Sequence, residues 1–581
     1  MTQQNLPADH PILEIKNLVT VFETRHGIFN AVDDVSLNLV PGETLCLVGE
    51  SGSGKSVLSR SILQLVDRPG RIASGEILLH EAHPSSKTEQ TRSLDLAKLE
   101  ARSGVIRNIR GRDIGMIFQE PMSSLSPVHT IGSQITESLV LHEGLNKKAA
   151  RDRVIEMLRR VEIPNPEKAI DQYPFEFSGG MRQRAMIAMA LICNPKILIA
   201  DEPTTALDVT IQAEILDLLN DLKKQNDMAI LFITHDMGVV AEIADHVAVM
   251  RHGKVIENGN VQDVFDRPKH DYTKALLKSA RDSQIPSPDR LAQRQVQPIG
   301  APILEASNLR KEFYGKTGLL GMTQTTLVAV NDASFTLHEG ETLGVVGESG
   351  SGKTTLARCI QRVHSIEAGQ LHYTNRGGDR AEISQLNDAQ LQPTWRDMRT
   401  VFQDPFASLN PRMSVSQIIG ESLLLNGMTS PVDRRKRILE LLDLVGLPSS
   451  ALERYPHAFS GGQRQRISIA RAIAPNPRII IADEATSALD VSIRTQIMDL
   501  LQELQKELRL SYVFISHDLG LVRYFCDRVL VMFKGDIVES GDSETVCTQP
   551  THDYTRALLS AVPITHPDQR GSRQRFRYEN G

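Results

Sequence analysis

The stretch Gly49-Glu50-Ser51-Gly52-Ser53-Gly54-Lys55-Ser56 decides the fold of the first half of this chain. It follows the apolar run from Thr44 to Val48 and precedes apolar residues at helical spacing, Leu58, Ile62 and Leu65. A glycine-rich loop between a strand and a helix can wrap backbone N–H groups around phosphates, and the start of the helix adds positive potential. The pattern therefore predicts a nucleotide phosphate site on an α/β fold.

The same stretch recurs in the second half as Gly347-Glu348-Ser349-Gly350-Ser351-Gly352-Lys353-Thr354. Further short motifs recur in the same order: Phe118-Gln119-Glu120-Pro121 with Phe402-Gln403-Asp404-Pro405, Phe177-Ser178-Gly179-Gly180 with Phe459-Ser460-Gly461-Gly462, Ala200-Asp201-Glu202 with Ala482-Asp483-Glu484, and Thr234-His235-Asp236 with Ser516-His517-Asp518. A repeat of this length is a duplicated whole domain rather than a solenoid unit. The chain is therefore expected to carry two complete nucleotide sites.

The composition is typical of a soluble protein with more than one domain. The chain has 581 residues, 40% of them apolar, and a net charge of −6, which argues against a nucleic-acid partner. No run of eighteen apolar residues is present, and Met1 to His10 lacks the blocks of a signal peptide. The five cysteines are scattered without a CxxC pattern, which fits a reducing cytosol and argues against a zinc or disulfide framework. We therefore expect no membrane span.

The offset between the two copies predicts the domain boundaries. The phosphate loops differ by 353 − 55 = 298 positions and the Ser-Gly-Gly motifs by 460 − 178 = 282, so the first copy carries 16 extra residues between them. The polar stretch from His80 to Arg92 is the expected insertion. The predicted segments are an N-terminal tail 1–12, a first domain 13–280, a proline-rich linker 281–302, a second domain 303–563 and a disordered tail 564–581.

Continuous apolar runs predict the arrangement of the strands. Besides Thr44 to Val48, they cover Ile197 to Ala200 and Ile230 to Ile233. Apolarity without alternation indicates strands that are buried on both faces, which is typical of parallel sheets in α/β proteins. Each domain is therefore expected to have a mostly parallel sheet as its core.

The polar residues at the ends of these runs fit phosphoryl chemistry. In the first copy, Lys55 is expected to reach the β- and γ-phosphates, and Ser56 to offer a hydroxyl to Mg²⁺. Asp201 ends a strand facing Mg²⁺, and Glu202 is placed to polarise the attacking water. The equivalents in the second copy are Lys353, Thr354, Asp483 and Glu484.

The motifs Ser178-Gly179-Gly180 and Ser460-Gly461-Gly462 each open a predicted helix. Such a helix start is an anion site. In isolation the tripeptide would be only a helix cap. Because each copy already has its own phosphate loop, we expect each motif to close over the γ-phosphate bound by the other copy.

This set of motifs resembles the ATP-binding cassette family over nearly the whole chain. The resemblance implies two tandem cassettes, each with a helical signature subdomain, that sandwich two ATP molecules head to tail. By the same resemblance, Gln119 and Gln403 are Q-loop residues that sense Mg²⁺, Asp208 and Asp490 belong to D-loops, and His235 and His517 are switch histidines. Phe22 and Phe313 are the candidates for stacking on adenine; Tyr314 is a rival in the second copy, and a core role for Phe22 is equally open.

Two further features resemble the oligopeptide, dipeptide and nickel importers. They are the segments after each Q-loop glutamine, Pro121 to Pro127 and Pro405 to Pro411, and the tails His270 to Leu277 and His552 to Leu559. The fused arrangement is most similar to that of glutathione importers. The resemblance implies an ATP-hydrolysing subunit that is peripheral on the cytoplasmic face of the bacterial inner membrane. This subunit powers uptake of a peptide-like solute through two separate permease subunits, to which an extracytoplasmic solute-binding protein delivers the solute. The two post-glutamine segments, with Leu125 and Leu409, are the expected docking sites for the permeases.

A soluble tandem ATPase acting on ribosomes is the alternative. The short proline-rich linker, the acidic balance and the His-Asp-Tyr-Thr tails favour the importer. The two copies also differ from each other. Met181 replaces the Gln463 of the second signature helix, from which little loss is expected. Glu176 replaces Ala458 two residues before the signature serine, which leaves equal coupling of the halves open.

Overall fold

The computed structural model describes residues 10–25, 27–81, 92–120, 124–205, 207–282, 286, 300–317, 323–486, 489–572, 575–576 and 578. Its contacts divide the chain into two compact units. The first comprises residues 1–207, 211–278 and 563–572, and the second comprises 208–210, 279–562 and 573–581. The two units are described one at a time below.

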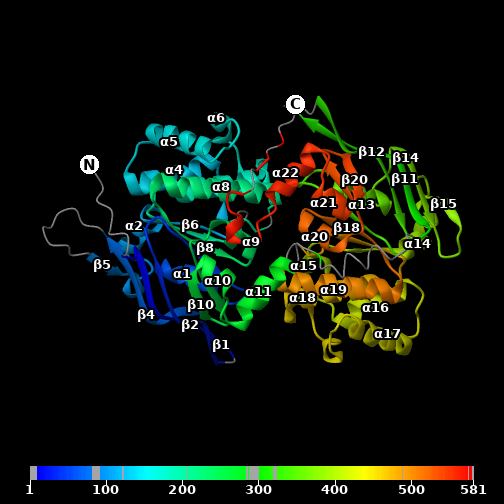
Figure 1. Cartoon of the computed structure of the whole chain (residues 1–581), viewed down its shortest axis with the longest axis horizontal. Coiled ribbons are helices and arrows are strands. Elements are labelled where there is room, and N and C mark those ends of the chain that lie inside the picture. Colours follow the sequence, from blue (N-terminus) through cyan, green and yellow to red (C-terminus); the bar gives the residue numbers. More distant parts are fainter. Residues whose placement is uncertain are drawn as a thin grey trace. The chain divides into compact units, whose positions relative to one another are not determined.

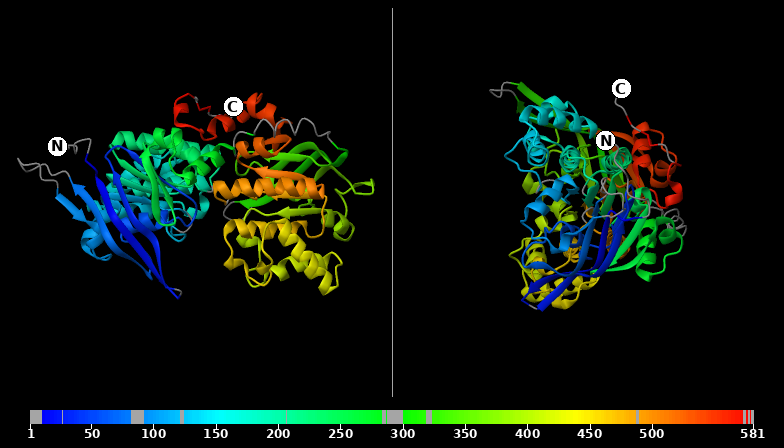
Figure 2. Two further views of the ribbon diagram at one scale, coloured as in Figure 1. Left: turned by 60° about the horizontal axis from the view of Figure 1, so that its bottom comes forward. Right: turned by 90° about the vertical axis from the view of Figure 1, so that its left-hand side faces the viewer.

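The first unit contains two sheets (Figure 1). A four-stranded antiparallel sheet has the order β2-β1-β4-β5, and a six-stranded sheet has the order β10-β9-β3-β8-β7-β6. The strands are β1 (Leu13–Thr24), β2 (Gly27–Leu39), β3 (Thr44–Val48), β4 (Gly70–Glu81), β5 (Arg92–Asp95), β6 (Ile114–Ile117), β7 (Ile197–Asp201), β8 (Ala229–Thr234), β9 (His246–Arg251) and β10 (Lys254–Asn260). The long strands β1 and β2 can be followed in blue in Figure 2.

In the first unit, helices lie between the successive parallel strands of the larger sheet along the chain. The helices of this unit are α1 (Lys55–Ile62), α2 (Gly104–Arg112), α4 (Ile131–Glu143), α5 (Lys147–Arg160), α6 (Pro166–Ala169), α7 (Gly179–Leu191), α8 (Val209–Asn226), α9 (Met237–Ile243), α10 (Val261–Asp266) and α11 (Asp271–Asp282). Short 3-10 turns are η1 (Leu96–Lys98), η2 (Pro174–Glu176) and, from the end of the chain, η5 (Pro567–Gln569). Figure 1 shows α4, α5 and α6 grouped together in cyan, and α4 and α5 also pack on α7.

The second unit repeats this architecture. Its antiparallel sheet has the order β12-β11-β14-β15 and its larger sheet the order β16-β17-β18-β13-β19-β20. The strands are β11 (Pro302–Thr317), β12 (Thr323–His338), β13 (Thr342–Val346), β14 (Ala368–Thr374), β15 (Arg380–Glu382), β16 (Met398–Val401), β17 (Ile479–Asp483), β18 (Ser511–Ser516), β19 (Arg528–Phe533) and β20 (Asp536–Asp542). The helices are α13 (Lys353–Ile360), α14 (Asp388–Asp397), α15 (Pro405–Ser408), α16 (Val415–Leu425), α17 (Pro431–Leu444), α18 (Gly461–Ile473), α19 (Val491–Leu508), α20 (Leu519–Phe525), α21 (Ser543–Thr548) and α22 (Asp553–Ala561), with the 3-10 turns η3 (Ser449–Ala451) and η4 (Pro456–Ala458).

The α/β class and the mostly parallel sheet are confirmed. In the six-stranded sheet of the first unit, β6, β7, β8, β3 and β9 pair in parallel, and only the edge strand β10 is antiparallel. All residues of β3, β7 and β8 are buried, as the unbroken apolar runs predict. Burial on both faces is what selects these short, β-branched segments as central strands.

Parallel pairing decides where the functional residues lie. Strands β6, β7, β8 and β3 run in one direction, so their carboxyl ends meet at one edge of the sheet. The residues just beyond those ends are Gln119, Glu202, His235 and Gly49. The corresponding edge of the second unit carries Gln403, Glu484, His517 and Gly347.

Several predicted segments differ from the structure in their extent. Helix α1 ends at Ile62, and Gln64 has a φ of 53°, so Leu65 lies beyond the helix on which it was expected. Asp282 still belongs to α11 and Pro302 already begins β11, so both ends of the predicted linker are regular structure. The tail expected to be disordered from 564 forms the turn η5 at Pro567–Gln569. Most of the expected insertion, residues 82–91, lies outside the described residues.

Candidate active site

Glycine is required in the phosphate loop because neighbouring backbone leaves no room for a side chain. Gly54 precedes α1 with a φ of 104°, and a Cβ there would lie 2.2 Å from the carbonyl oxygen of Ala31. Gly352 has a φ of 105° and the same 2.2 Å approach to Ala329. These glycines let the loop turn directly into the N-terminus of α1 or α13, where unpaired N–H groups can receive an anion.

The loop lysines are buried and stand at the first position of the helix that follows each loop. Lys55 is 4% exposed, and its ammonium donates to the carbonyl oxygens of Gly49 at 2.6 Å and Glu50 at 2.9 Å. Lys353 makes the same pair of bonds, to Gly347 at 2.7 Å and Glu348 at 2.8 Å. Burial lowers the pKa of Lys353, while nearby carboxylates including Glu484 oppose that shift. The structure thus brings a lysine to each predicted phosphate position.

A hydroxyl and a carboxylate meet beside each loop. The Ser56 hydroxyl donates to Asp201 at 3.0 Å, and the Thr354 hydroxyl donates to Asp483 at 3.3 Å. Burial raises the pKa of both aspartates, and the adjacent Glu202 or Glu484 adds to the rise. Hard oxygen donors of this kind suit Mg²⁺, which takes one or two protein ligands and completes its shell with phosphates and water. Among the described residues, no group of three or more His, Cys, Asp or Glu is placed to hold a metal.

The glutamate after each of these aspartates is held by several polar side chains. Glu202 receives hydrogen bonds from the Gln119 amide at 3.1 Å and the Thr205 hydroxyl at 2.9 Å, and His235 Nδ1 lies 3.4 Å from its other carboxylate oxygen. Burial alone would raise the pKa of Glu202, but His235 and Thr205 lower it to about 2. The carboxylate is therefore ionised at neutral pH, as a general base requires.

Glu484 in the second unit has the equivalent surroundings. Gln403 donates to it at 2.8 Å, and His517 Nδ1 lies 3.4 Å away. Burial opposes ionisation, but the hydrogen bond and charge of His517 lower the pKa of Glu484 below its usual value. The structure thus brings a glutamine, a glutamate and a histidine together within each unit.

Both glutamates have an unusual backbone conformation. The φ angle is 47° at Glu202 and 48° at Glu484, in the left-handed region that residues other than glycine seldom adopt. Such conformations cost about 1–3 kcal/mol and concentrate at functional sites. Sequence patterns gave no indication of this strain, nor of the role of Thr205.

The signature motifs form exposed helix starts. Ser178 caps α7 by accepting from the Met181 N–H at 3.3 Å, and Ser460 caps α18 by accepting from the Gln463 N–H at 3.3 Å. Both serines are exposed to solvent. The second motif has an additional bond, since the Gln463 side chain accepts from the Ser460 N–H at 3.2 Å. Met181 has no such acceptor, so the exchange of glutamine for methionine removes half of a capping box.

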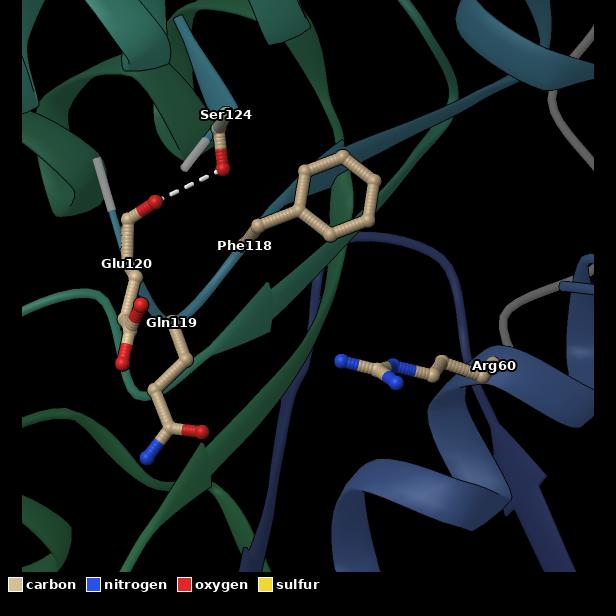
Figure 3. A pocket seen from close by; sticks show the side chains of 5 residues that line it. All are labelled: Arg60, Phe118, Gln119, Glu120 and Ser124. Carbon is tan, nitrogen blue, oxygen red and sulfur yellow. Dashed lines mark hydrogen bonds between the residues drawn. The ribbon is translucent and has the colours of Figure 1, made fainter. Parts of the chain in front are cut away.

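The first Q-loop lines a pocket of about 500 Å³. Figure 3 shows the Arg60 guanidinium from α1 extending toward Phe118 and Gln119, which follow β6. Glu120 and Ser124 complete the lining, and the Ser124 hydroxyl donates to the Glu120 carbonyl at 2.8 Å. A cation in this position complements the anionic ligand expected at the neighbouring loop.

The two leucines that were expected to contact the permeases are buried. Leu125 is 4% exposed and Leu409 is 1% exposed, so both belong to the interior rather than to a docking face. Pro121, Met122 and Ser123 of the same segment lie outside the described residues. An irregular segment has no periodicity from which the buried side could be read.

Phe406 of the second predicted docking segment is 63% exposed, and further exposed apolar side chains occur at the end of the next helix in both units. Val140 and Leu141 on α4 are 42% and 71% exposed, and Leu424 and Leu425 on α16 are 48% and 80% exposed. Their offset, 425 − 141 = 284, equals that of the Q-loop glutamines, 403 − 119 = 284. Both units therefore expose an aliphatic pair at the same structural position.

The remaining predicted residues are the aromatic candidates and the two aspartates that precede helices; of these, Asp208 accepts a hydrogen bond from the Ser349 N–H of the second phosphate loop at 2.9 Å. Phe22 is half-buried in β1 beside Gly70. Phe313 is 38% exposed in β11 with its ring edge-on to His364, and the rival Tyr314 donates to Glu312. The D-loop residues precede helices: Asp208 stands before α8 and Asp490 before α19, while Ala206 and Ala488 lie outside the described residues.

Two family models match this chain. The ABC transporter model matches residues 32–205 and 330–487. The model of the oligopeptide/dipeptide transporter C-terminal region matches residues 256–306 and 538–579. Both therefore match twice, once in each repeat.

Curated relatives match the tandem arrangement as a whole. The glutathione import ATP-binding protein GsiA of Pectobacterium atrosepticum is 45% identical, with 97% of this chain and 91% of the relative covered. The proteins of that name from Escherichia coli and Salmonella typhi are 45% and 44% identical over the same shares. In the described part of the chain, no helix has the length and apolarity needed to cross a bilayer. With two ATPase cassettes matched in sequence and folded as described, the chain belongs to the ABC transporter family.

Proposed function

We propose that this chain is the ATP-hydrolysing subunit that energises an importer of glutathione or a similar small peptide. The observation that carries the proposal is the repeated arrangement around Glu202 and Glu484. In each unit an ionised, mostly buried carboxylate stands next to a phosphate loop and is held by a glutamine and a histidine. Intact residues in both units favour two hydrolytic sites.

The chain's own side chains account for the proposed chemistry. Lys55 exchanges its two carbonyl partners for the β- and γ-phosphate oxygens of ATP, and the N–H groups at the start of α1 complete the cradle. Glu202 orients and polarises the attacking water, and His235 keeps that carboxylate in place. Ser56, Asp201 and Gln119 would hold Mg²⁺, which supplies charge neutralisation for the phosphates when bound.

The solute class is inferred from the relatives. The named relatives are glutathione import proteins, and the C-terminal region matches that of oligopeptide and dipeptide transporters in both repeats. Glutathione is itself a tripeptide. Substrate choice in such a system belongs to the permeases and the solute-binding protein, so the chemistry of this chain fits any member of the class.

The permease partners are proposed to dock on the exposed aliphatic pairs of α4 and α16. Val140-Leu141 and Leu424-Leu425 lie on α4 and α16, the helices that follow the segments after Gln119 and Gln403. A movement of either glutamine could therefore be passed along a short stretch of chain to the exposed pair. Two equivalent apolar positions suit two homologous permease subunits. The chain is accordingly proposed to be a peripheral subunit on the cytoplasmic face of the inner membrane.

The proposal is tested by transport in reconstituted vesicles. The full chain would be assembled with the two permeases and the solute-binding protein of a glutathione importer, and ATP-dependent uptake of labelled glutathione and dipeptides would be measured. The Glu202→Gln, Glu484→Gln chain serves as the matched control. Uptake that requires ATP and is lost in the control supports the function; a chain that sediments with ribosomes instead and energises no uptake contradicts it.

A further inference from the structure

A tyrosine hydroxyl contacts the phosphate loop in each unit from a segment far away in the sequence. The N–H of Glu50 donates to the Tyr272 hydroxyl oxygen at 3.1 Å, and the N–H of Glu348 donates to the Tyr554 hydroxyl oxygen at 3.0 Å. The residues of each pair are separated by 222 and 206 positions. Both tyrosines belong to the His-Asp-Tyr-Thr tails, for which the motifs of the nucleotide site leave no role.

Each tyrosine is held rigidly at the start of its helix. Tyr272 is 8% exposed and Tyr554 is 1% exposed. Its own N–H donates to the Nδ1 of the preceding histidine, at 3.0 Å from Tyr272 to His270 and 3.1 Å from Tyr554 to His552. A hydroxyl on a buried ring in a fixed helix turn is a preorganised acceptor.

The start of the helix is in turn fixed to the preceding strand. Glu257 of β10 accepts from the backbone N–H groups of Lys269 at 2.7 Å and His270 at 3.0 Å. Glu539 of β20 accepts from Thr551 at 2.8 Å and His552 at 3.1 Å. A continuous series of hydrogen bonds thus leads from the edge strand through the histidine and tyrosine to the phosphate loop.

The hydroxyl contact is kept although the ring has different neighbours in the two units. The guanidinium of Arg251, at the end of β9, lies 4.7 Å from the Tyr272 ring centre. At the equivalent position, 251 + 282 = 533, the Phe533 ring packs on Tyr554 with centres 4.4 Å apart. Ring packing alone would not require a hydroxyl in both units, so the common element is the bond to the loop.

We propose that Tyr272 and Tyr554 are positioning residues that keep the phosphate loops in their binding conformation. Glu50 is bound through both of its backbone polar groups: its carbonyl oxygen accepts from Lys55 at 2.9 Å, and its N–H donates to the Tyr272 hydroxyl. When the lysine turns to a phosphate, its hold on that carbonyl is lost and the tyrosine bond remains. This inference rests on the proposed ATP chemistry.

The test removes only the hydroxyl, in the full-length chain. Tyr272→Phe and Tyr554→Phe keep the ring, and Tyr512→Phe is the matched control. Tyr512 is fully buried in the second unit, and its hydroxyl donates to the Leu501 carbonyl at 2.8 Å, away from the loop. The control therefore loses a buried tyrosine hydroxyl and its bond to a backbone group, here as donor rather than acceptor, without touching the phosphate loop.

Two measurements separate positioning from a general structural role. In hydrogen exchange without nucleotide, the amide of Glu50 should exchange faster in Tyr272→Phe only, and that of Glu348 in Tyr554→Phe only. In ATPase assays, KM for ATP should rise about fivefold in the double variant, the net effect of a typical hydrogen bond, while kcat changes less than twofold. Tyr512→Phe should change neither.

The outcomes are distinct. If both phenylalanine variants behave as the Tyr512→Phe control does in exchange and in KM, the tyrosines have no positioning role. A lowered kcat at unchanged KM and unchanged exchange would also overturn it. Because the exchange experiment needs no hydrolysis, failure of the wild-type chain to hydrolyse ATP would overturn the proposed function separately from this one.

Discussion

His235 Nδ1 lies 3.4 Å from a carboxylate oxygen of Glu202, and this contact links two strands that are neighbours in the sheet. Glu202 follows β7 and His235 follows β8, so the parallel pairing itself sets their separation. The histidine thereby holds the carboxylate ionised and oriented before any water is activated.

Removing the charge of both carboxylates should stop turnover without preventing ATP binding. The double change Glu202→Gln, Glu484→Gln removes the general base, which is typically worth 10²–10⁴-fold, and leaves the phosphate cradle intact. We expect kcat to fall at least about 100-fold. Steady-state ATPase assays and equilibrium binding of a fluorescent ATP analogue measure the two quantities. Turnover within twofold of wild type would exclude both glutamates as bases.

The backbone strain at Glu202 predicts an inverted order of stability. At most positions a protein is more stable with alanine than with glycine, but at a φ of 47° the Cβ of alanine is sterically disfavoured. Glu202→Gly should therefore unfold at higher denaturant concentration than Glu202→Ala, by about 1 kcal/mol in the free energy of unfolding. Both variants lose the same carboxylate, so the difference isolates the backbone. An Ala variant of equal or greater stability would show that the position carries no strain.

The lowered pKa of Glu202 predicts how its contribution to stability depends on pH. Its folded-state pKa of about 2 lies below the ordinary 4.5, so ionisation favours the folded state above pH 4.5, and this contribution is lost as the pH falls from 4.5 toward 2. The difference in Tm between wild type and Glu202→Gln should therefore be constant from pH 7 to about 5 and shrink below 4.5. Scanning calorimetry over this range measures it. A difference that shrinks already between pH 7 and 6 would assign the effect to another group.

Substitutions at exposed and buried leucines should separate docking from folding. Leu141→Asp with Leu425→Asp should leave stability within about 0.5 kcal/mol, retain ATP binding and abolish ATP-driven uptake. Leu125→Asp should instead destabilise the fold by about 4 kcal/mol or more, because it buries an unpaired charge. Thermal unfolding and vesicle uptake compare the two. Normal uptake by the Leu141, Leu425 double variant would remove these residues from the permease interface.

The signature serines are predicted to act on the nucleotide of the other cassette. Ser178→Arg should abolish photolabelling of the loop 347–354 by an azido-ATP analogue and spare the loop 49–56. Ser178→Ala is the control, since it loses the helix cap, at a cost of about 1 kcal/mol, without adding bulk or charge. Peptide mapping after labelling identifies the loop. Loss at 49–56 would mean that the motif serves its own cassette.

The sequence was most informative where burial is continuous. Thr44–Val48 was predicted to the residue because five consecutive buried positions leave no alternative to a central strand. The polar residues at strand ends followed from the same argument. Leu125 and Leu409 were misplaced because an irregular segment with prolines has no period that tells an inward leucine from an outward one. The left-handed φ of Glu202 and the tyrosine contact to Glu50 arise only from tertiary structure, since no local propensity specifies either.

The contact between Tyr272 and Glu50 also bears on how a minimal cassette should be cut from this chain. A fragment that stops at the end of β10, at Asn260, would contain every nucleotide motif of the first repeat and would look complete by sequence. It would nevertheless lack α11 and with it the hydroxyl that the loop binds. A fragment that keeps this contact within a complete helix extends to Asp282. Low nucleotide affinity in a fragment that ends before α11 would result from the missing tyrosine contact and would not be a property of the full-length enzyme.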